Sequence, residues 1–106
     1  MISRDEALEI IDRLPYLRTI QAPNDRILLE FFEKAMATED CVEWAKIIKT
    51  CYIRRADDSP RQRLSEKTAA VGEEAQARFR GELAQALGIA PEEVDSYIER
   101  HLAETL

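Results

Sequence analysis

This chain of 106 residues has few of the residues that build metal or phosphate-binding motifs. It has one histidine and two cysteines without CxxC spacing, so it lacks the ligands of a structural zinc site. Its glycines, Gly72, Gly81 and Gly88, form neither GxGxxG nor GxxxxGK, which excludes the common phosphate loops. No apolar run approaches the roughly 20 residues that span a bilayer, and no secretory signal pattern occurs. We therefore expect a soluble, cytoplasmic protein without metal or cofactor.

Cysteine and histidine chemistry also has little support. On one helix, Cys41 and Cys51 would lie roughly 15 Å apart, whereas the Cα atoms of a disulfide are about 4.4–6.8 Å apart. We interpret both as small buried hydrophobic residues. The single histidine, His101, lies near an expected helix C-terminus, and Ser96 and Tyr97 are too close in sequence to form a persuasive general-base pair with it. We expect no catalytic residues, no small-molecule substrate and no enzyme activity.

The apolar pattern is helical throughout, since no segment alternates apolar and polar residues over a strand's length. It predicts a single all-α domain over residues 1–106, a compact bundle of about five helices. The expected start signals are Ser3 with Glu6, Asn24 or Asp25, Asp40 with Glu43, Ser65 and Pro91, and the expected stops are Pro15 and Gly88. The predicted buried faces are Ala7, Leu8, Ile10, Ile11 and Leu14; Ile27, Leu28, Phe31, Phe32, Ala35 and Met36; Cys41, Trp44, Ala45, Ile48, Cys51 and Tyr52; Val71, Ala75, Phe79, Leu83 and Leu87; and Val94, Tyr97, Ile98, His101 and Leu102.

One stretch of this acidic chain is basic. The net charge is −6 overall, but residues 41–63 carry 6 basic and 3 acidic residues. On a helical wheel for the helix expected over residues 40–55, Lys46, Lys49 and Arg54 fall opposite the apolar face. Ile53 falls inside this basic face and Ile47 near its edge. The face suits phosphate contact, together with Arg55, Arg61 and Arg63, or it is an ordinary solvated helix end.

The sequence also resembles a known family. VEWAKIIKTCYIRR, a polar loop, LSEKTAAVGEEAQARFR and GELAQALGI at residues 81–89 resemble the C-terminal helical domain of the CarD/CdnL family of bacterial transcription regulators. SRDEALEIIDRLP at residues 3–15 resembles the start of that domain in some members, so the resemblance covers nearly the whole chain.

The resemblance implies a function at promoters. Family members bind the RNA polymerase β subunit through an N-terminal Tudor-like domain, and their helical domain contacts promoter DNA at the upstream edge of the transcription bubble. We expect that N-terminal domain to be absent from this chain, because helices account for all 106 residues. The DNA contacts implied here are Arg26, Lys46, Lys49, Arg54 and Arg55.

A wedge tryptophan of many family members has no counterpart here. The corresponding region reads APNDRI, with Asn24 or Asp25 at that position, and Trp44 belongs to the expected core. We therefore expect backbone contact without base specificity and weak binding by this domain alone. The alternative is a helical protein-interaction module that docks an acidic partner or a companion domain through the basic face, with Ile47 and Ile53 in it, and makes no direct DNA contact.

Overall fold

Five α-helices and two short 3-10 turns make up the computed structural model, which describes residues 2–57 and 59–103. The helices are α1 (Arg4–Arg13), α2 (Asp25–Ala37), α3 (Cys41–Ala56), α4 (Glu66–Leu87) and α5 (Pro91–Ala103), and the turns are η1 (Leu14–Tyr16) and η2 (Pro60–Gln62). No strand occurs among the described residues. The predicted all-α bundle of about five helices is confirmed.

The helix boundaries follow from the capping residues in the sequence. Ser3 Oγ accepts the Glu6 N–H at 3.1 Å and Glu6 Oε1 accepts the Ser3 N–H at 3.2 Å, so α1 begins with a complete capping box. Asn24, rather than Asp25, caps α2 by accepting the Ile27 N–H at 2.9 Å. These bonds satisfy backbone donors that the first turn of a helix leaves without partners.

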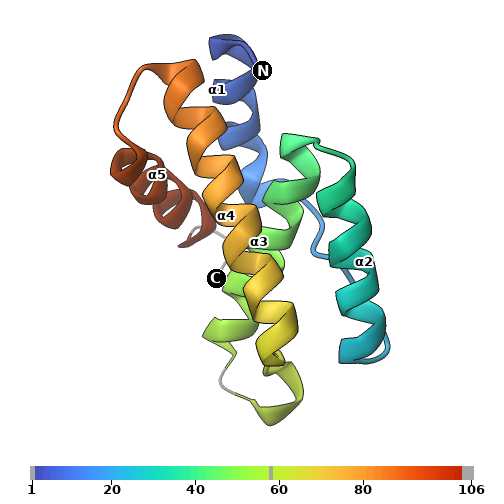
Figure 1. The fold of residues 1–106 in the computed structure, drawn as a ribbon. Coiled ribbons are helices and arrows are strands. Elements are labelled where there is room, and N and C mark those ends of the chain that lie inside the picture. The colour runs from blue at the N-terminus through green and yellow to red at the C-terminus, as the bar shows by residue number, and fades with distance from the viewer. Residues whose placement is uncertain (1, 58, 104–106) are drawn as a thin grey trace.

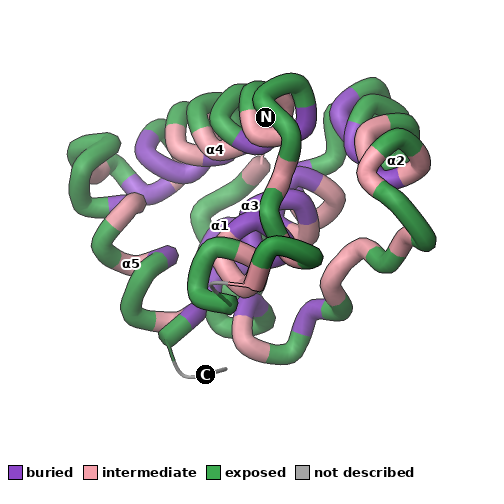
Figure 2. Tube along the Cα trace, turned by 90° about the horizontal axis from the view of Figure 1, so that it is seen from below, coloured by how far each residue is buried: buried purple, intermediate pink, exposed green. Residues whose placement is uncertain are grey.

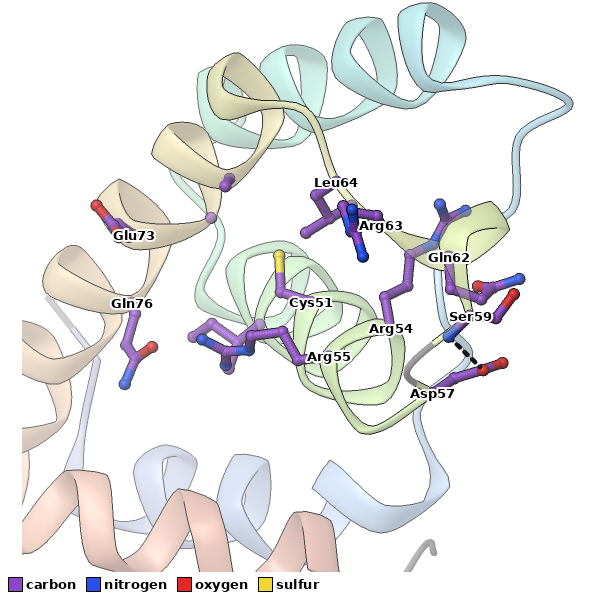
Figure 3. A pocket seen from close by; sticks show the side chains of 13 residues that line it. Cys51, Arg54, Arg55, Asp57, Ser59, Gln62, Arg63, Leu64, Glu73 and Gln76 are labelled. Atoms are coloured by element: carbon purple, nitrogen blue, oxygen red, sulfur yellow. Dashed lines mark hydrogen bonds between the residues drawn. The ribbon is translucent and has the colours of Figure 1, made fainter.

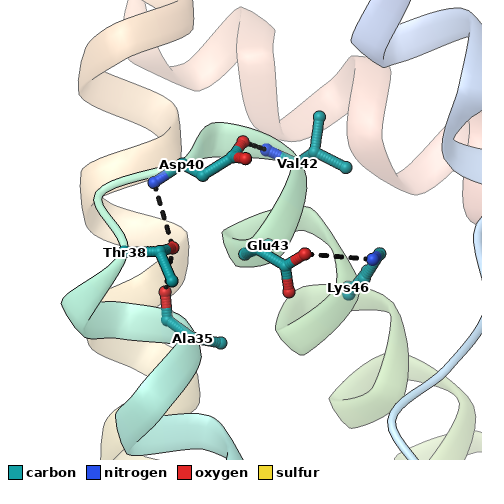
Figure 4. A network of polar contacts seen from close by, with 6 residues as sticks. All are labelled: Ala35, Thr38, Asp40, Val42, Glu43 and Lys46. Atoms are coloured by element: carbon teal, nitrogen blue, oxygen red, sulfur yellow. Dashed lines mark hydrogen bonds and ion pairs between the residues drawn. The ribbon is translucent and has the colours of Figure 1, made fainter.

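The turn between α2 and α3 is held by a short chain of hydrogen bonds (Figure 4). Thr38 Oγ1 donates to the Ala35 carbonyl at 2.7 Å and accepts the Asp40 N–H at 3.3 Å. Asp40 Oδ1 then accepts the Val42 N–H at 2.8 Å, which caps α3. The capping box expected from Asp40 and Glu43 does not form, because Asp40 accepts from Val42 rather than from Glu43, and the Glu43 carboxylate pairs with Lys46.

The signals around α4 also act as expected. Ser65 caps α4, because its Oγ accepts the Thr68 N–H at 3.2 Å. Gly88 ends the helix in the left-handed conformation, with φ of 66°, which a residue without a Cβ adopts at little cost. Pro91 is the first residue of α5.

The long helix α4 organises the bundle, since it packs against all four other helices (Figure 1). Its 22 residues give it a length of about 33 Å, close to the longest molecular dimension of 38 Å. Its buried positions lie on the side that faces α3 (Figure 2). Phe79 of α4 and Phe32 of α2 are fully buried, and each such side chain contributes about 1.5–3 kcal/mol of transfer free energy.

Two apolar residues expected in the core lie at the surface. Leu8 of α1 is 43 % exposed and Phe31 of α2 is 38 % exposed, although each lies beside the buried stripe of its helix. The predicted apolar faces were too wide here, because α1 and α2 are outer helices with neighbours on one side only. Trp44, Cys41 and Cys51 are buried as expected.

Helix α3 is buried on more of its circumference than its sequence indicated. Ile47 is 0 % exposed and Thr50 is 2 % exposed, although the wheel put Ile47 at the edge of a solvated face. The connector between η1 and α2 covers this side, because the Ile20 N–H donates to Thr50 Oγ1 at 2.8 Å. The expectation of fully separate core and basic faces on α3 is therefore wrong.

Candidate nucleic-acid interface

The start of α2, the end of α3 and the start of α4 lie at the same end of the bundle (Figure 1). A hydrogen-bonded carboxylate joins two of these elements. Asp25 Oδ1 accepts the Ser65 N–H at 3.2 Å and Asp25 Oδ2 accepts the Thr68 hydroxyl at 3.0 Å. Burial alone would raise the pKa of Asp25, but the hydrogen bonds from Ser65 and Thr68 and the charge of Arg54 together lower it. Asp25 is therefore ionised near neutral pH and fixes the start of α4 to the start of α2.

Five arginines gather at this end, and we call them the basic end: Arg26, Arg54, Arg55, Arg61 and Arg63. Arg54 is partly buried and the other four are exposed. Within the described part of the chain, no member of the basic end forms an ion pair. Their charges are therefore available to an anionic partner.

The loop from α3 to α4 positions the last two of these arginines. Asp57 Oδ1 accepts the Ser59 N–H at 3.2 Å, and Ser59 Oγ accepts the Arg61 N–H at 3.3 Å. The turn η2 starts at Pro60, whose fixed φ suits the first position of a helical turn. Arg61 and Arg63 thus lie on a segment with a defined backbone path.

Lys49 does not belong to the basic surface, contrary to the expectation from the wheel. Its side chain is 5 % exposed, and its Nζ donates to the carbonyl oxygens of Pro15 at 2.7 Å and Leu17 at 2.6 Å. Burial lowers the pKa of this lysine. Because the ammonium is hydrogen-bonded to the connector after α1, Lys49 does not lie on the exposed basic surface, and we do not include it among the proposed DNA contacts.

Lys46 is a poor member of the interface for a different reason. Its Nζ lies 3.0 Å from Glu43 Oε1 in a half-exposed ion pair one turn away on the same helix (Figure 4). Arg54 lies eight positions further along α3, a rise of roughly 12 Å. Its charge is already matched, and it lies away from the basic end. Of the five DNA contacts expected from the sequence, the structure brings together Arg26, Arg54 and Arg55.

A pocket of about 370 Å³ opens beside the basic end, between the second half of α3 and the first half of α4 (Figure 3). Arg54, Arg55 and Arg63 stand around its rim, together with the acidic side chains of Asp57 and Glu73. The floor is apolar or small and consists of Ile48, Cys51, Leu64, Ala69 and Gly72. Nothing in the sequence indicated this pocket, because its walls come from two helices and a loop that meet only in the folded chain.

The thiol of Cys51 lies at the floor of this pocket and packs against α4. A Cβ on Gly72 would lie 2.6 Å from Cys51 Sγ, so only glycine fits without a shift. Burial raises the pKa of Cys51 to about 11, although Arg55 and Arg54 oppose this rise. The thiol is protonated near neutral pH and acts as a packing group, since the thiolate is the nucleophilic form.

Two other side chains that could act in catalysis or metal binding, His101 and Cys41, are hydrogen-bonded or buried within the fold. His101 Nδ1 lies 2.8 Å from the Tyr97 carbonyl, one turn earlier on α5. Cys41 is buried and its pKa is raised to about 11, mainly by burial. Across residues 2–57 and 59–103, no three histidine, cysteine or acidic side chains converge as metal ligands would. None of the described helices combines the length and apolar character that a bilayer crossing requires.

Comparison with known proteins gives no relative, because no family model, no curated protein and no solved structure matches this chain. The resemblance to the CarD/CdnL helical domain therefore stays a prediction from the sequence motifs.

Proposed function

We propose that this chain is a DNA-contacting helical domain of the CarD-like kind, which binds the phosphate backbone of promoter DNA through Arg26, Arg54 and Arg55. The observation that carries the proposal is the basic end, where five arginines that form no ion pair with any described residue gather on an otherwise acidic protein. Their guanidinium groups have the planar donor geometry that matches phosphate oxygens. Arg61 and Arg63 extend the same surface along the α3–α4 loop.

The contact is electrostatic and independent of base sequence. Each neutralised phosphate releases condensed counterions, so three arginine contacts correspond to a slope of about −3 in a plot of log affinity against log salt concentration. The net charge of −6 opposes DNA elsewhere on the surface, so binding by this domain alone is weak. A linked domain that holds RNA polymerase, on its β subunit in the CarD-like mechanism, supplies the effective concentration that the helical domain lacks.

The protein-interaction alternative loses one of its supports. It used Ile47 and Ile53 as apolar anchors within the basic face, but Ile47 is fully buried and Ile53 is partly buried. Docking of a protein partner usually depends on a few apolar or aromatic anchors at the centre of the contact. The basic end is therefore better suited to a polyanion than to a folded protein surface.

Amide chemical-shift mapping tests the proposal. A duplex DNA fragment is titrated into the 15N-labelled protein at low salt, and the same titration is repeated at high salt. We expect shifts at the start of α2, the end of α3 and the α3–α4 loop, and we expect salt to suppress them. Shifts confined to α5 and the first half of α1, or no shifts at low salt, would contradict the proposal.

A further inference from the structure

The pocket beside the basic end has the dimensions of a ligand site. Its volume of about 370 Å³ falls within the range of about 300–1,000 Å³ that is typical of small-molecule sites. It is bounded by two packed helices and the α3–α4 loop, so its walls are largely preformed (Figure 3). The close approach of Cys51 Sγ to Gly72 fixes the spacing of α3 and α4 at its floor.

The chemistry of the pocket is divided between floor and rim. Ile48, Cys51 and Ala69 present hydrocarbon and a protonated thiol at the floor. At the rim, Arg55 extends toward α4 and Gln76, while Arg54 and Arg63 lie on the side of the α3–α4 loop (Figure 3). The acidic groups at the rim are fewer than the arginines, since only Asp57 and Glu73 belong to its described lining. The described part of the rim therefore carries three arginines and two carboxylates above an apolar floor.

We propose that this pocket binds a small organic anion, with its carboxylate or phosphate head on the rim arginines and a short aliphatic body on the floor. Guanidinium groups pair well with either head group through parallel hydrogen bonds. None of the described lining residues is aromatic, so the pocket offers no platform on which a nucleobase would stack. The site does not depend on DNA binding, although it shares Arg54 and Arg55 with the proposed interface.

Four probes separate the contributions of head and body: hexanoate, hexyl phosphate, acetate and hexanol. Binding is followed by the amide shifts of Cys51, Ala69 and Gly72 at the floor. We expect hexanoate or hexyl phosphate to bind at least tenfold more tightly than both acetate, which lacks the body, and hexanol, which lacks the charge. The stronger of the two anions identifies the head group that the site prefers.

A matched pair of variants locates the site. Ala69→Leu fills the floor, whereas Ala70→Leu adds the same side chain at the next position of α4, which is exposed and does not line the pocket. We expect Ala69→Leu to weaken hexanoate binding at least tenfold and Ala70→Leu to leave it unchanged. As a second variant that keeps the floor intact, Arg55→Gln/Arg63→Gln should reduce hexanoate binding toward that of hexanol.

Three results would overturn the proposal: no binding by either amphipathic anion, equal binding of hexanol and hexanoate, or hexanoate binding that both sets of pocket substitutions leave unchanged. The outcome is independent of the DNA titration. Hexanoate binding without DNA binding would support the ligand site and contradict the proposed function. DNA binding without hexanoate binding would support the proposed function and contradict the ligand site.

Discussion

The ammonium group of Lys49 donates a hydrogen bond of 2.6 Å to the carbonyl oxygen of Leu17, and this bond fastens the connector after α1 to the central helix α3. A second bond from the same group to Pro15 completes the contact. A lysine in the most basic stretch of the chain thus has a role in folding. Substitutions of Lys49 therefore test the stability of the fold and cannot test its affinity for DNA.

We expect Lys49→Met to lower the free energy of unfolding by about 1–3 kcal/mol, because it leaves the Pro15 and Leu17 carbonyl oxygens without their donor. Lys46→Met is the control, since it removes only a half-exposed ion pair of at most about 1 kcal/mol. Urea unfolding followed by circular dichroism measures both variants. Equal stability of Lys49→Met and the wild type would show that the connector does not need this lysine.

Asp25 should make the stability of the bundle depend on acid pH. The pKa of Asp25 is lowered from its ordinary value in the folded state, so its stabilising effect is fully present above the ordinary pKa of an aspartate and is lost as the pH falls through the folded pKa. We expect Asp25→Ala to cost about 1–3 kcal/mol at pH 7 and progressively less in acid. Asp5→Ala is the control, because Asp5 also lies in the first turn of a helix but has no hydrogen-bond partner among the described residues. A pH-independent difference between Asp25→Ala and the wild type would contradict the role of this carboxylate.

The contact of Gly72 with Cys51 predicts a strong coupling between these two positions. Gly72→Ala should destabilise the protein by about 1–3 kcal/mol, because the new Cβ overlaps the sulfur. In a Cys51→Ala background the nearest atom would be the Cβ of residue 51 at 3.8 Å, an ordinary contact. There we expect Gly72→Ala to be neutral or stabilising by up to about 1 kcal/mol, as Ala is a better helix former. A double-mutant cycle without coupling would refute the overlap.

The other two glycines should respond to alanine in opposite directions. Gly81 lies inside α4 with no atom within 4 Å of an added Cβ, so Gly81→Ala should stabilise the protein by about 0.5–1 kcal/mol. Gly88 has open space as well, but its φ of 66° is strained for alanine, and Gly88→Ala should cost about 1–2 kcal/mol. Thermal unfolding of both variants provides the comparison. A melting temperature raised in both would mean that α4 does not end in a left-handed residue at Gly88.

Local signals in the sequence specified most of the fold. Ser3, Asn24, Asp40 and Ser65 each cap the helix that follows, and Gly88 stops α4, because such bonds depend on residues only two or three positions away. The spacing of apolar residues along the sequence could not show how much of a helix surface is covered by other parts of the chain. Lys49 and Ile47 were placed near solvent because the wheel of α3 does not contain the connector that packs over it.

The candidate site was predictable only in part. The end of α3 was recognisable by Arg54 and Arg55 in the helix's last turn. Arg26 was named only through a family resemblance, and no local signal could show that the start of α2 lies near the end of α3. The pocket at Cys51 and Gly72 depends on the same long-range packing. Charge in a sequence thus identifies candidate residues, and tertiary contacts decide which of them remain available.

The most direct test of the central claim compares DNA affinity for two double charge reversals. The variant Arg54→Glu/Arg55→Glu alters the basic end, and the control Arg13→Glu/Lys34→Glu makes the same change in net charge elsewhere. All four residues lie in the last turn of a helix. Each substitution therefore loses a similar favourable interaction with the helix dipole. Fluorescence anisotropy with a labelled promoter duplex gives affinity as a function of salt. We expect the first variant to lose at least tenfold in affinity at low salt and the second to lose much less. Equal losses in the two variants would contradict the account, because binding would then follow net charge and not the arginines of the basic end.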